Sequence, residues 1–152
     1  MFIKLKKIFQ ADFEYYQGVS RAKIYLLRLL YSLMFIVLGI DVWSYIFSFQ
    51  GVWEPGEAMK WSVWASFSAL AGLGIIHPLR MLPILLLEIF YKLLWLLIVA
   101  YPLWLKDELI GSSAEGMTNA FLWVILAIIA VPWKFVFKNY FLKPKQVVRH
   151  SA

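Results

Sequence analysis

The chain has 152 residues, of which 62% are apolar and only 16% are charged, and its mean hydropathy is +0.73. These values exclude an ordinary soluble globular domain and predict a single membrane domain over residues 1–152. The net charge of +6 does not indicate a nucleic-acid partner, because the basic residues stand at the ends of apolar runs and form no basic stripe. The absence of cysteine excludes disulfides, thiolate catalysis and cysteine-ligated metal centres.

The first 17 residues have the pattern of an amphipathic helix. Apolar side chains recur there every three or four residues, at Phe2, Leu5, Phe9, Phe13 and Tyr16. Lys4 and Lys7 fall mainly off this stripe, so we expect a helix over 1–17 that lies in the membrane interface, with these lysines as candidate lipid head-group contacts. The alternative is a soluble helix packed on the inner end of the protein. The acidic residues Asp12 and Glu14, with no long apolar core, do not fit a cleavable signal peptide.

Four apolar segments follow, and each approaches the roughly 20 residues that a helix needs to cross a bilayer. They cover about residues 25–47, 61–76, 82–104 and 118–137. The short turn His77–Arg80 makes the second and third segments antiparallel neighbours. Because Pro102 and Pro132 fall near segment ends, we expect no deep kinks. The pattern predicts an all-α fold, an integral membrane four-helix bundle with an N-terminal amphipathic interfacial helix and a basic cytoplasmic tail over 138–152.

The distribution of lysine and arginine predicts the orientation. Basic residues crowd the N-terminal segment, the turn at Arg80 and the tail, whereas the other two loops carry mostly Asp and Glu. We therefore expect both termini in the cytoplasm and the protein in a bacterial inner membrane. Lys134 and Lys138 stand where the fourth segment leaves the bilayer, and we interpret them as topology anchors or as lipid head-group contacts.

Ionisable residues inside the apolar segments are the main candidates for a functional site. Glu88 and Lys92 are one helical turn apart, so both side chains lie on one face, in the favourable order for an ion pair. Counted from the inner boundary, Arg28 lies at a depth similar to that of Glu88, so these two residues are expected to pair. Asp41 is expected either within reach of a stretched Lys92 side chain or at the outer interface, with its carboxylate near water. A buried charge is costly, so the group marks either a proton relay, binding site or pore lining, or a self-neutralised clamp between helices.

The second apolar segment carries small residues at spacings of three and four, a pattern that lets helix backbones approach closely. Its members are Ser62, Ala65, Ser66, Ala69 and Gly72. We expect this face to pack within the fold, and a homodimer face is the alternative.

Several catalytic and cofactor motifs are missing. The two histidines lie at or beyond the membrane boundary, and no His, Asp or Glu cluster has the spacing of a metal site. The sequence has no Gly-rich phosphate loop and no nucleophile elbow. We therefore expect neither a metal nor catalysis, although an enzyme is not excluded; a quinone or a lipid is a candidate ligand.

The first apolar segment, Leu27–Ile40, resembles the opening helix of DoxX-like small membrane proteins, with Arg28 near its start and Gly39 toward its end. The resemblance implies four spans and a role linked to quinones, sulfur oxidation or redox-stress complexes. The segment Gly74–Pro83, with Glu88, Tyr91, Lys92 and Trp95, is similar to small bacterial membrane proteins of unassigned function.

The sequence thus predicts a non-catalytic multi-pass membrane protein, either an accessory subunit of a membrane complex or a bundle that binds a small ligand or lipid. Its expected partners are the bilayer and other membrane subunits or further copies of itself. Two alternatives remain: a proton- or solute-conducting oligomer that uses Glu88 and Lys92, and a quinone-linked redox accessory protein of the DoxX type.

Overall fold

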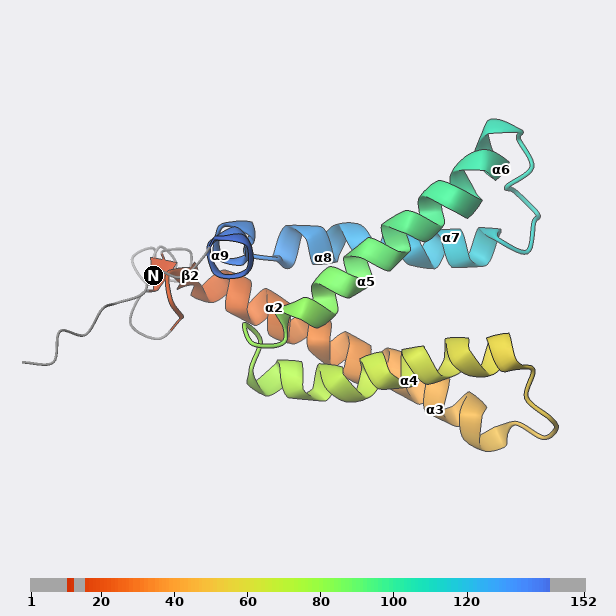
Figure 1. Ribbon diagram of the computed structural model, residues 1–152, viewed down its shortest axis with the longest axis horizontal. Helices are drawn as coiled ribbons and strands as arrows, with labels where there is room; N and C mark the ends of the chain where they lie inside the picture. Colours follow the sequence, from red (N-terminus) through yellow and green to blue (C-terminus); the bar gives the residue numbers. More distant parts are fainter. Residues whose placement is uncertain (1–10, 13–15, 143–152) are drawn as a thin grey trace, which may run out of the picture.

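The computed structural model describes residues 11–12 and 16–142, and this part of the chain is mostly helical (Figure 1). Three stretches follow one another without a break in the first long helix: α2 (Arg21–Leu33), the π-helical turn η1 (Met34–Leu38) and α3 (Gly39–Ser48). The second helix is α4 (Pro55–Ile76). The third is formed by α5 (Leu82–Trp95), the π-helical turn η2 (Leu96–Ala100) and α6 (Tyr101–Leu105).

In the described part of the chain, these three helices are long and apolar enough to cross a membrane. Their side chains mostly point outward, since no more than 28% of the most apolar 18-residue window of each helix is buried. Large apolar side chains such as Ile40, Phe90 and Leu97 are exposed along the helices. Soluble monomeric proteins rarely expose large apolar side chains in such numbers along their helices.

The fourth predicted segment is not one straight helix. It consists of α7 (Glu115–Leu122), α8 (Val124–Ala130), a break at residues 131–132, and then α9 (Trp133–Val136) with the π-helical turn η3 (Phe137–Phe141). The axis turns by 70° at the break. The structure therefore differs from the continuous helix expected over 118–137, and the expectation that Pro132 causes no deep kink is wrong. Pro132 lacks the N–H that would continue the hydrogen-bond ladder, and it keeps Val131 out of the helical conformation.

The carbonyl groups that the break exposes find new donors. The carbonyl of Ile128, which would have bonded the missing N–H of Pro132, accepts a hydrogen bond from the indole of Trp133 (2.9 Å). Lys23 reaches across from α2 and donates to the carbonyls of Val131 (3.0 Å) and Ile129 (3.3 Å). The bend is thus fixed by side chains from two elements, which supply hydrogen-bond donors to the carbonyl groups that the break frees.

The helices form two pairs that are joined at one end and diverge at the other (Figure 1). The first pair is the α2–α3 helix with α4, and the second is the α5–α6 helix with α7 and α8. The pairs meet where α2 contacts α8 and where the turn after α4 leads into α5. Tyr31 anchors this end: it is fully buried, packs its ring against Gly74, and donates a hydrogen bond to the carbonyl of Pro78 in the turn (3.3 Å).

Aromatic residues gather at the opposite end, around the loop between α3 and α4. Tyr45 stacks on Trp61 and Phe49 stacks on Trp53, each pair with ring centroids 4.0 Å apart. Glu54 caps α4 by accepting a hydrogen bond from the backbone of Glu57 (2.7 Å). The backbone N–H groups of Gly56 and Glu57 favour the ionised carboxylate and lower the pKa of Glu54. Together these contacts fix the start of the second helix.

The N-terminal segment differs from the predicted helix where the structure describes it. Strand β1 (Ala11–Asp12) pairs with strand β2 (Val19–Ser20) in antiparallel register. Gln17 and Gly18 have positive φ angles of 52° and 85°, and they reverse the chain between the strands. The expected helix over 1–17 is therefore absent at residues 11–12 and 16–17, while Lys4 and Lys7 lie outside the described residues.

Candidate functional site

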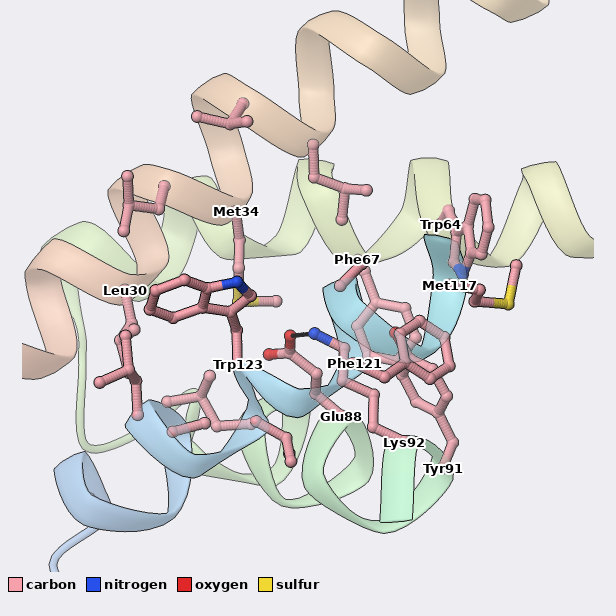
Figure 2. A pocket seen from close by; sticks show the side chains of 18 of the residues that line it. Leu30, Met34, Trp64, Phe67, Glu88, Tyr91, Lys92, Met117, Phe121 and Trp123 are labelled. Atoms are coloured by element: carbon pink, nitrogen blue, oxygen red, sulfur yellow. Dashed lines mark hydrogen bonds and ion pairs between the residues drawn. The ribbon is translucent and has the colours of Figure 1, made fainter. Parts of the chain in front are cut away.

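A cavity of about 780 Å³ lies in the space where the two helix pairs diverge (Figure 2). Every long helical segment contributes to its walls: α2, η1 and α3 on one side, α4 on the second, α5 on the third, and α7 with α8 on the fourth. The lining is almost entirely apolar and aromatic, with Leu30, Met34, Trp64, Phe67, Leu85, Met117, Phe121, Trp123 and Val124 among its members. The volume lies within the range typical of sites for small organic ligands.

The polar group of this cavity is the predicted ion pair. Lys92 Nζ lies 2.6 Å from Glu88 Oε1, and both side chains are shielded, with 17% and 11% of their surfaces exposed. Figure 2 shows the pair projecting from α5 between side chains of the other helices. The spacing of four residues places the two groups on consecutive turns, so the pair forms within one helix. Each charge is neutralised by the other, which lowers the cost of keeping both out of water.

Aromatic rings enclose the ion pair on one side. Lys92 Nζ lies 5.6 Å from the centroid of the Phe121 ring, within the range of a cation–π interaction. Tyr91 packs between Phe121 (5.7 Å between centroids) and Phe67 (5.5 Å), which brings α4, α5 and α7 together. Sequence reasoning missed Phe67 and Phe121, because one aromatic residue among many in an apolar run carries no signal for the wall it forms.

The expected pairing of Arg28 with Glu88 does not occur. Among the described residues Arg28 makes no ion pair, and its Nε atom is buried without a hydrogen-bond partner. Glu88 pairs with Lys92 on its own helix instead, since a partner one turn away is within reach without any rearrangement. Equal depth in two helices does not ensure contact, because each side chain also has to point toward the other helix.

Asp41 lines the cavity at its other end from α3, and its side chain is exposed. It contributes a second carboxylate to the wall, separate from the ion pair. The π-helical turn η1 supplies Met34, Val37 and Leu38 to the same wall. Such turns widen a helix by one residue and often occur at functional sites. Nothing in the residue pattern of 34–38 indicated this turn.

The small residues of α4 divide between two faces. Ala65 is buried and Gly72 lies against the ring of Phe35, so these two positions let α4 approach the first helix. Ser62, Ser66 and Ala69 are exposed, on the side of α4 that turns away from the packed residues. Buried Ser68 belongs to the packed face and accepts a hydrogen bond from the indole of Trp43 (3.0 Å).

The described residues contain no group of three or more His, Cys, Asp or Glu side chains placed to hold a metal ion. The cavity offers instead one buried carboxylate–ammonium pair, one exposed carboxylate and a large apolar surface. This arrangement can accept the polar head of a small molecule beside Glu88 and Lys92 and its apolar body against the aromatic rings. No family model, curated protein or solved structure matches the chain.

Proposed function

We propose that the protein is a non-catalytic, multi-pass membrane protein that binds one amphipathic small molecule in the cavity between its helix pairs. The observation that carries the proposal is the cavity itself: about 780 Å³ of mainly apolar space around a single shielded ion pair. Ligand sites in proteins combine a large apolar surface with a few placed polar groups in this way. The proposed location is the bacterial inner membrane, with both termini in the cytoplasm and with other membrane subunits as partners.

A ligand with a flat or chain-like apolar body and a hydrogen-bonding head fits these walls. Tyr91, Phe67 and Phe121 offer ring faces and edges, and Lys92 has three N–H donors, of which Glu88 takes one. A quinone has two carbonyl acceptors on a flat ring and a hydrocarbon tail, so it matches this combination. The resemblance of residues 27–40 to DoxX-like proteins supports a quinone as the first ligand to test.

The test is a titration of the full chain in lipid nanodiscs with decylubiquinone. Binding is measured as quenching of tryptophan fluorescence, since Trp64 and Trp123 line the cavity. Ala120→Phe places a ring into the cavity from an exposed position on α7 and should weaken binding at least tenfold. Ile125→Phe is the matched control, because it adds a similar ring to α8 at an exposed position outside the lining. Oleic acid serves as a second probe with a carboxyl head and a plain acyl chain.

Saturable quenching that Ala120→Phe weakens and Ile125→Phe preserves supports a ligand site in this cavity. Competition by oleic acid would extend the ligand class to single-chain lipids. Quenching that both variants leave unchanged, or that never saturates, would mean that the quinone only partitions into the bilayer, and it would overturn the proposal.

A further inference from the structure

A second cavity, of about 580 Å³, lies at the bend between α8 and α9, beside the hairpin of β1 and β2. Its lining comes from two distant parts of the chain. One part consists of Gln17, Gly18, Val19, Ser20 and Lys23, and the other of Pro132, Trp133, Lys134, Phe135 and Lys138. Among these described residues three are lysines and none is acidic. The cavity is therefore a pocket of positive potential.

The three lysines of this pocket have N–H groups that can donate hydrogen bonds to a ligand. Lys134 and Lys138 are one turn apart, so both side chains project on the same side of the α9–η3 segment. Within the described part of the chain neither of them forms an ion pair, and both are exposed. Lys23 donates to the carbonyls of Ile129 and Val131, which leaves one of its three N–H groups for another acceptor.

The position of this pocket indicates where its ligand lies. The α9–η3 segment turns 70° away from α8 and is seen nearly end-on in Figure 1. If α7 and α8 cross a membrane, as proposed above, this segment runs along the membrane surface. The exposed residues Phe137 and Phe141 follow Lys134 by three and seven positions, so they project on the same side as Lys134 and Lys138. Exposed aromatic rings beside lysines whose long side chains reach toward water are typical of the head-group level of a membrane.

We infer that this pocket binds the phosphate of an anionic phospholipid, with Lys134 and Lys138 as the main contacts, Lys23 at the rim and the ring of Trp133 beside the glycerol region. The same lysines would suit free phosphate, since the ligand chemistry is shared. The membrane-level position of the pocket and the exposed aromatic residues beside it favour the lipid.

The experiment measures binding to the full chain in detergent by native mass spectrometry. The probes are dioleoyl phosphatidylglycerol, dioleoyl phosphatidylcholine and sodium phosphate. Replacing Lys134 and Lys138 together by Gln should weaken phosphatidylglycerol binding about 25-fold, because a lysine near an anionic surface contributes about 1 kcal/mol and 1.4 kcal/mol is a factor of ten. Both side chains are exposed, so the melting temperature without lipid should not change.

The control replaces Lys60, near the start of α4, and Lys106, directly after α6, together by Gln, which removes the same formal charge from positions outside the second cavity. Preference for phosphatidylglycerol over phosphatidylcholine, lost in the first double variant and kept in the control, supports the site. Equal losses in both variants, or no preference between the lipids, would show attraction by net charge alone and overturn it. Displacement of phosphatidylglycerol by sodium phosphate at similar concentration would overturn the assignment to a lipid.

The two proposed sites are separable in this experiment. Ala120→Phe should leave phosphatidylglycerol binding unchanged, since Ala120 does not line the second cavity. The Lys134 and Lys138 variant should likewise leave decylubiquinone binding unchanged. A negative result for one proposed site therefore leaves the proposal for the other site intact.

Discussion

At the scale of single residues, the Glu88–Lys92 pair is the most consequential contact in the protein. Both groups are largely withdrawn from solvent and no other described residue forms an ion pair with either of them. Removing one partner from a buried pair leaves the other charge stranded, which typically costs about 3–5 kcal/mol. Replacing both by apolar residues of similar size removes the stranded charge together with the pair.

We therefore predict that Glu88→Leu and Lys92→Met each lower the melting temperature of the purified protein sharply, and that the double variant recovers most of the loss. The pair of Glu57 and Lys60 provides the control, because it is also formed within one helix but is more exposed. Glu57→Gln should cost no more than about 1 kcal/mol, as surface ion pairs usually do. If single variants of Glu88 and Lys92 lose no more stability than Glu57→Gln, the pair is not buried in the folded protein.

Gly74 shows a different residue-scale constraint. A Cβ atom added there would meet the ring of Tyr31 at a distance that real Cβ atoms do not show. The absence of a side chain lets α4 sit directly on this ring, whose hydroxyl holds the turn into α5. The sequence indicated close packing along this helix, but it did not indicate that one tyrosine is the surface being packed against.

At the scale of elements, the bend at residues 131–132 depends on a residue more than a hundred positions earlier. Lys23 donates hydrogen bonds to the carbonyls of Ile129 and Val131. We predict that Lys23→Met destabilises the bend by about 1–2 kcal/mol, at the lower end of the range for hydrogen bonds from a charged donor because Lys23 is partly exposed. Hydrogen exchange at the backbone amides of residues 131 and 133–136 should accelerate accordingly.

Lys106→Met is the control for that measurement, since Lys106 is exposed and directly follows α6, which lies far from α9 in Figure 1. It should leave exchange at residues 131 and 133–136 unchanged. Equal exchange in the Lys23 and Lys106 variants would mean that Trp133 and the ladder of α8 hold the bend without Lys23.

The apolar pattern was sufficient to locate the helices but not their departures from regularity. The expected segment 82–104 differs from the observed helix Leu82–Leu105 by one residue, because a long apolar run bounded by polar turns leaves little freedom. The second helix begins at Pro55, earlier than the expected residue 61, because Glu54 caps it. The first turn of this helix contains polar residues, so hydropathy alone did not assign it to the apolar segment. The π-helical turns and the contact of Lys23 depend on tertiary packing, which periodicity does not encode.

At the scale of the whole molecule, the helix pairs diverge toward the end that carries the α3–α4 loop (Figure 1). Residues of both pairs line the main cavity. The sequence predicted a helical membrane bundle and the one ion pair of this cavity. It did not predict the cavity, because its walls are drawn from four separate helices whose relative angles are set by side-chain packing. The proposed ligand fills the space that a closely packed bundle would fill with its own side chains.

The bend bears directly on whether the fourth segment crosses the membrane. The α7–α8 stretch, Glu115–Ala130, spans only about 24 Å at 1.5 Å per residue, whereas the hydrocarbon core is about 30 Å thick. The α7–α8 stretch crosses the membrane only if the α9–η3 segment lies at the surface opposite the one where α7 begins. If it does not, the stretch enters the membrane and returns to the side from which it came.

Because the chain has no cysteine, single cysteines can be introduced at His77, Val52 and Ile110, all of them exposed, and labelled in intact cells with a membrane-impermeant maleimide. We predict that Val52→Cys and Ile110→Cys are labelled from outside while His77→Cys is not, since the basic residues place the turn at Arg80 in the cytoplasm. A cytoplasmic reporter fused after Ala152 should be active, on the same side as His77. A reporter located on the side of Ile110 would leave three crossings and a re-entrant segment, and it would place the lysines of α9 and η3 on the opposite surface from the one proposed.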